Sequence, residues 1–88
     1  MRILVICRPA EGGDPAEFRR LVPAETAELR DLKARGILAE AWSPGGPGAV
    51  LVLDVAGEPD AARLVAGFPL VRAGLIGTEL IPLHPIEL

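Results

Sequence analysis

Two short runs of this sequence are apolar at every position, and they limit the folds that the chain can adopt. The runs are residues 3–7 (ILVIC) and 50–53 (VLVL). A strand with one wet face alternates apolar and polar residues, whereas an unbroken apolar run needs apolar contacts on both faces. Both runs are therefore predicted to be central strands of a sheet that is covered on each side.

Two helical patterns separate the strand-like segments. The first extends over residues 14–35, with Asp14 as N-cap, a proline at the first helical position and a glycine after its end. Pro23 lies in its middle and predicts a kink or a break into two helices. The second pattern extends over residues 57–67, again with a proline near its start.

The remaining segments complete a β-α-β-β-α-β order. Residues 37–42 and 49–55 are predicted strands joined by a Pro- and Gly-rich turn, and residues 75–83 form the last strand, after a loop or short turn at 70–74. This order predicts an α+β, ferredoxin-like domain that spans residues 1–88. Its four-stranded antiparallel sheet would carry two helices on one face.

The second face of that sheet needs a partner. Half of the residues are apolar, which is high for a chain of 88 residues with room for one small core. The simplest way to cover the apolar second face is to pack it against the same face of another copy. We therefore expect a homodimer with sheet-to-sheet packing.

Composition excludes several classes of function. The net charge of −3 and the lack of a basic run argue against nucleic-acid binding. No apolar run is long enough to span a membrane, and no signal peptide precedes the first strand, so we expect a cytoplasmic protein. Cys7 is the only cysteine and His84 the only histidine, so neither a disulfide nor a metal site is expected.

Several residues, taken together in their order and spacing, resemble the muconolactone isomerase family. They are Asp14-Pro15-Ala16, Glu25, Leu29, Leu32, Gly36, Trp42, Asp54-Val55, Phe68-Pro69-Leu70 and His84-Pro85. The resemblance implies a dimeric α+β barrel, a larger ring of dimers, and a pocket between the sheet and the helices. It also implies a reaction that moves a double bond in an unsaturated lactone acid without metal or organic cofactor. The sequence departs from the family in having no tyrosine and no aromatic residue at 70–74.

Glu25 is the candidate catalytic base. It lies within the apolar stripe that the first helix forms at 100° per residue, which consists of Phe18, Val22, Leu29 and Leu32. Burial on that stripe would raise the pKa of the carboxyl group and suit it to remove a proton near neutral pH. The alternative is that Pro23 begins a new helix and that Glu25 caps its first turn.

His84 is the second candidate catalytic residue, because it titrates near neutrality and lies in a proline-flanked tail that could reach a neighbouring subunit. An exposed terminal residue is the alternative. Arg72 could hold a substrate carboxylate through a bidentate contact, or it is a solvated loop charge. Glu40 and Trp42 share a strand face and could form a polar and aromatic wall of a substrate site, unless Trp42 packs in the core and Glu40 faces solvent.

Two functional hypotheses follow. The first is a cofactor-free isomerase of a small unsaturated lactone or carboxylic acid, with Glu25 as base. The second is a non-catalytic homo-oligomeric module that binds a small apolar ligand. The position of the Glu25 carboxylate distinguishes them, because a base must reach a cavity whereas a cap contacts backbone N–H groups.

Overall fold

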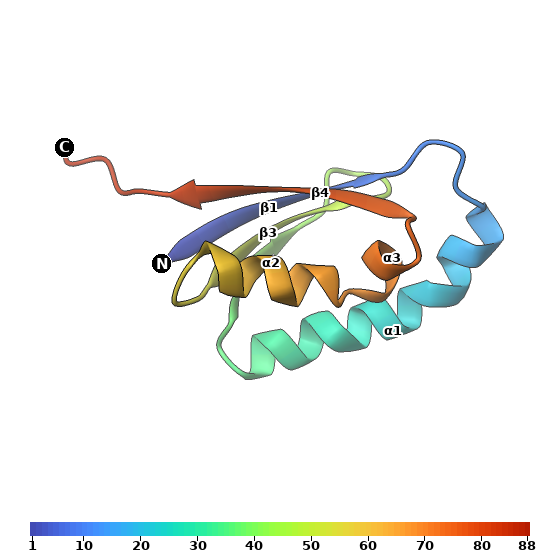
Figure 1. Ribbon diagram of the computed structural model, residues 1–88, viewed down its shortest axis with the longest axis horizontal. Helices are drawn as coiled ribbons and strands as arrows, with labels where there is room; N and C mark the ends of the chain where they lie inside the picture. The colour runs from blue at the N-terminus through green and yellow to red at the C-terminus, as the bar shows by residue number, and fades with distance from the viewer.

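One four-stranded antiparallel sheet carries every helix on a single face in the computed structural model, which describes residues 1–88 (Figure 1). The elements in chain order are β1 (Arg2–Pro9), α1 (Pro15–Ala34), β2 (Leu38–Trp42), β3 (Ala49–Asp54), α2 (Glu58–Ala66), α3 (Pro69–Arg72) and β4 (Ile76–Leu83). The strand order is β2-β3-β1-β4, so the two apolar runs form the central strands, as predicted. This is the ferredoxin-like arrangement, which confirms the predicted fold class.

The core lies between the sheet and the helices. On β1 the buried side chains are Ile3, Val5 and Cys7, which alternate with Leu4 and Ile6 on the other face. The helices contribute buried side chains that pack against them, namely Leu32, Ala61, Val65, Phe68 and Leu70. Burial of apolar surface is the main favourable term in folding, so this layer holds the helices on the sheet.

Helix α1 passes through Pro23 as one element, so of the predicted kink or break at this residue the break is wrong. The helix extends from Pro15 to Ala34 with Pro23 inside it. Proline removes one backbone hydrogen bond. On both sides of this position, however, α1 packs side chains such as Phe18 and Leu29 against the same core. Both halves of α1 are thus held by burial on one sheet.

The turn between β2 and β3 closes tightly against β1. Gly48 has a φ of 107°, and a Cβ atom built there would lie 2.6 Å from the carbonyl oxygen of Cys7. A glycine is therefore required on both conformational and steric grounds. Beyond β3, residues 69–72 form the short helix α3. The sequence had predicted a loop or short turn at residues 70–74.

The second face of the sheet has no helix on it and is called the open face below. Strand pairing aligns its apolar side chains across all four strands: Leu4, Ile6, Trp42, Val50, Val52, Ile81 and Leu83. Ion pairs lie among them, with N–O distances of 3.7 Å for Arg2–Glu40 and 3.1 Å for Arg8–Glu79. No helix of the chain is both long and apolar enough to cross a membrane.

Candidate functional site

A cavity of about 210 Å³ lies between α1 and the sheet. Its wall comes from β1, α1, the β2–β3 turn, β3, α3 and β4. The lining residues are Cys7, Phe18, Val22, Glu25, Thr26, Leu29, Pro47, Gly48, Ala49, Leu51, Leu70 and Ile76. We call it the inner cavity. Most of its surface is apolar, and Glu25 is the only carboxylate in its wall, as is usual for a site in which few polar groups orient a small ligand.

Glu25 has a half-buried carboxylate with a single protein partner. Its Oε1 accepts a hydrogen bond of 2.9 Å from the backbone N–H of Leu70, at the start of α3. Burial raises the pKa of Glu25 and the charge of Glu28 raises it further, whereas the Leu70 hydrogen bond acts in the opposite direction. The net pKa lies above that of an ordinary glutamate, which suits a group that accepts a proton near neutral pH.

The structure excludes one of the two alternatives for Glu25. Because α1 begins at Pro15, Glu25 does not cap a new helix at Pro23, and that interpretation is wrong. The carboxylate nevertheless contacts a backbone N–H, that of Leu70 on α3, with one oxygen. Glu25 also lines the inner cavity. A carboxylate has about four acceptor sites, so one hydrogen bond leaves capacity for a ligand.

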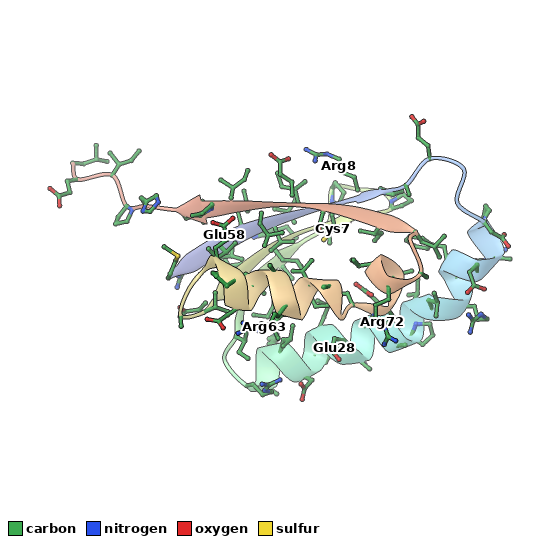
Figure 2. The ribbon with its side chains drawn as sticks, in the orientation of Figure 1. Cys7, Arg8, Glu28, Glu58, Arg63 and Arg72 are labelled. Atoms are coloured by element: carbon green, nitrogen blue, oxygen red, sulfur yellow. The ribbon has the colours of Figure 1, made fainter.

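Cys7 lies in the same cavity, on the side of the sheet that the helices cover (Figure 2). Burial raises the pKa of its thiol to about 11, and the nearby Glu25 carboxylate contributes to the increase. A thiol with this pKa stays protonated at neutral pH and is a poor nucleophile. Cys7 is thus a small buried residue of the core.

A second, more open cavity of about 430 Å³ adjoins the first, at the start of α1. The two cavities share Phe18, Val22 and Pro47 in their walls. This outer cavity also includes Arg19 and Asp14, and the Asp14 side chain accepts a hydrogen bond of 3.0 Å from Ala16 N–H. A small molecule in the outer cavity would therefore lie next to the space that Glu25 lines.

Trp42 and Glu40 lie away from both cavities. They belong to the open face, on the opposite side of the sheet from α1. Trp42 is 64% exposed and donates a hydrogen bond of 3.1 Å from Nε1 to Glu40 Oε1. The predicted pairing of the two side chains is present, but within one chain they form no wall of the site around Glu25.

Neither Arg72 nor His84 lines the inner cavity. Arg72 ends α3 and lies over α1 (Figure 2), in the wall of a separate hollow that Arg20 also lines. His84 follows β4 and lies near Met1 and Arg2, at the start of β1. The inner cavity lies toward the other end of β1, where Cys7 lines it. An eight-residue strand is about 25 Å long, which is roughly the separation of His84 from the cavity. The structure thus brings together none of the other predicted site residues with Glu25.

Sequence reasoning missed Arg19, Thr26 and Cys7 as cavity residues. Arg19 carries the clearest signal that could have been used. The positions three and four residues away on either side hold no acidic residue, so no neighbour on its own helix can pair with it.

No group of three or more His, Cys, Asp and Glu side chains lies close enough to hold a metal ion.

The overall fold is similar to two solved structures. Muconolactone isomerase shares 22% sequence identity with this chain and a TM-score of 0.77, over 99% of this chain and 94% of its own. The 5-chloro-2-hydroxyhydroquinone dehydrochlorinase of Burkholderia phenoliruptrix AC1100, in complex with 2,5-dihydroxybenzoquinone, shares 20% identity and a TM-score of 0.72, over 96% and 94%. No protein-family model and no curated protein matches the sequence. The chain has a muconolactone isomerase-like fold, which confirms the resemblance seen in its sequence.

Proposed function

We propose that this protein is a cofactor-free isomerase that shifts a double bond within a small unsaturated lactone or carboxylic acid. The observation that carries the proposal is the half-buried Glu25 carboxylate, which has a raised pKa and lines an apolar cavity. The muconolactone isomerase-like fold supports the choice of reaction. Identity of 22% does not by itself carry function, so the site is the basis of the argument.

Glu25 would act as base and then as acid. Its carboxylate removes the proton from the ring carbon beyond the double bond, which is conjugated with the lactone carbonyl, and the electron pair of the broken C–H bond enters a conjugated enolate. The protonated Glu25 returns the proton to the carbon next to the carbonyl, two carbons away, and the double bond has moved with no net change in atoms or charge. The apolar wall shields the enolate from bulk water.

A second copy of the chain is part of the proposal. No helix covers the apolar side chains of the open face in one chain, and packing two such faces about a two-fold axis would complete their burial. His84 lies about a strand length from Glu25 of its own chain. A role for His84 as proton partner, and one for Trp42 and Glu40 at a substrate site, therefore requires a neighbouring copy. A ring of such dimers would be a further level of assembly.

The test is the isomerisation of muconolactone in D₂O, followed by proton NMR. We expect the wild-type chain to move the double bond and to introduce deuterium at the carbon next to the carbonyl. Glu25→Gln should lower the rate by about 10²–10⁴-fold, the usual contribution of a general base. Glu28→Gln is the matched control, because Glu28 is a carboxylate one turn further along α1 that lines neither cavity, and it should retain activity within a few-fold. Equal activity of Glu25→Gln and wild type would remove Glu25 from the mechanism.

The second candidate function is a non-catalytic module that binds a small apolar ligand. The hydrogen bond from Leu70 N–H to Glu25 favours it, because it gives the carboxylate a structural role as well. Binding of muconolactone without turnover or deuterium exchange would support the module and contradict the isomerase.

A further inference from the structure

Arg19 is the only cationic side chain in the walls of the two joined cavities. Five other arginines form ion pairs within the chain: Arg2, Arg8, Arg20, Arg35 and Arg63. Arg19 forms none, because Pro15, Ala16, Val22 and Pro23 occupy the helix positions where a carboxylate could reach it. Its guanidinium is thus free to bind an anion from outside the chain.

We propose that Arg19 binds the carboxylate of the substrate at the outer cavity while the apolar part of the molecule reaches Glu25 in the inner cavity. This inference rests on the proposed function and assigns the polar end of its substrate. Phe18 and Val22, which line both cavities, would contact the part in between. Arg19 is then the residue that selects an anionic substrate, in place of Arg72.

The spacing of the two charged residues suits this assignment. Arg19 and Glu25 lie about 9 Å apart along the axis of α1, at about 1.5 Å per residue. Two carboxylates, one on the substrate and one on Glu25, repel each other and must be kept apart while the reacting carbon reaches the base. The substrate is therefore a monocarboxylate whose reacting carbon lies several bonds from its carboxylate group.

Other charges at the outer cavity are few. Asp14 is the only acidic residue in its wall, and one of its oxygens is occupied by the N–H of Ala16. Glu17 is hydrogen-bonded to Arg20 on the neighbouring turn. The start of α1 also adds a partial positive charge, since the N-terminal N–H groups of a helix point outward. The balance favours an anion close to Arg19.

The test measures binding of two probes by NMR titration: cyclohexylacetate and its neutral amide, cyclohexylacetamide. We expect wild type to prefer the carboxylate and Arg19→Gln to weaken its binding by about 10–100-fold, in the range of a charge-assisted hydrogen bond. Binding of the amide should change less than about two-fold. The carboxylate affinity of wild type should also fall as salt is added, since the contact is exposed to solvent.

Two variants serve as controls. Arg30→Gln removes an arginine of α1 that forms no ion pair and lines no cavity, and it should bind both probes as wild type does. Arg72→Gln tests the anchor that the sequence had suggested. Unchanged carboxylate binding by Arg19→Gln, or a loss confined to Arg72→Gln, would overturn the assignment to Arg19.

Failure here is distinguishable from failure of the proposed function. Arg19-dependent binding of cyclohexylacetate with no turnover of muconolactone would contradict the proposed isomerase activity and support the anion site at Arg19. Turnover that is unaffected by Arg19→Gln would support the isomerase activity and contradict the anion site. Circular dichroism of each variant checks that the exposed substitution leaves the fold intact.

Discussion

At Glu25, burial and a backbone hydrogen bond act on one carboxyl group in opposite directions. Burial disfavours the charged form and raises its pKa, while the N–H of Leu70 favours the charged form. Burial is the stronger influence. The same residue therefore helps to hold α3 against α1, and its pKa is shifted in the direction that general-base catalysis near neutral pH needs.

The pH dependence of activity follows from this balance. Catalysis needs ionised Glu25, so the rate should rise with pH through its raised pKa and then level off. Glu28→Gln removes a neighbouring negative charge that raises this pKa, so the rising limb should move to lower pH. The check is the pH profile of kcat/KM for both proteins. A limb that stays in place would show that Glu28 has no influence on the base.

Stability should depend on pH in a related way. The folded-state pKa of Glu25 is raised, so the folded protein holds the proton more tightly than the unfolded chain, and this contribution to stability is lost as pH rises through the folded pKa. Glu25→Gln should therefore equal or exceed wild type in stability at pH 8 and lose that advantage at pH 4, as measured by urea denaturation. If Glu25→Gln were less stable than wild type at pH 8 but not at pH 4, the expected direction of the pH dependence would be wrong.

Glu25→Ala tests the hydrogen bond between Glu25 and Leu70. It leaves Leu70 N–H without its acceptor and should cost about 1–2 kcal/mol relative to Glu25→Gln at both pH values. Gln keeps an acceptor oxygen, so the comparison of the two variants by urea denaturation separates the hydrogen bond from the charge. Equal stability of Glu25→Ala and Glu25→Gln would show that the bond contributes nothing.

Part of the candidate site could be predicted from the sequence. The 100° spacing places Glu25 on the buried stripe, because a helix of regular pitch fixes which residues share a face. The same rule cannot place Arg72 or His84, which lie outside the long helices, and it cannot say which side of the sheet Trp42 faces. Those positions depend on strand register and on how α3 lies over α1, which only the assembled fold determines.

Among the elements, the β2–β3 turn has the strictest local requirement. Gly48→Ala would place a Cβ atom 2.6 Å from the Cys7 carbonyl oxygen at a positive φ, and should destabilise the chain by about 2–4 kcal/mol. Gly46→Ala is the control, since open space surrounds a Cβ atom there. Thermal denaturation of both variants gives the comparison. A Gly48→Ala protein as stable as the control would mean that the turn can move away from β1.

Element boundaries were predicted closely because the signals are local. Asp14 caps α1 through the Ala16 N–H bond, as the Asp-Pro pair indicates. The sequence left open whether Pro23 kinks α1 or breaks it, because that depends on the sheet beneath the helix. Helix α3 was missed as a helix for a similar reason: its four residues are too few for periodicity, and it is held by Glu25, 45 residues away in sequence.

For the whole molecule, the open face is the main surface without a partner. Ile81→Asp should keep a proposed dimer from forming, since it would bury a charge without a partner in the interface. Ile81 is 36% exposed in one chain, so the substitution should leave the monomer folded. Ile86→Asp is the control, because Ile86 is 79% exposed on the tail beyond the sheet. Sedimentation equilibrium should give a dimer for wild type and the control; a wild-type monomer would contradict the proposal.

The pairing of β1 with β4 also governs how the chain folds. This pairing places Arg2 beside Leu83. The central strand β1 therefore gains β4 as a neighbour only when the two ends of the chain come together. The β2–β3 hairpin, by contrast, closes over a short turn. Contacts between distant segments form late and slow the search for the native state. The hairpin should then form before β4 joins the sheet, and substitutions in β4 should speed unfolding more than they slow refolding.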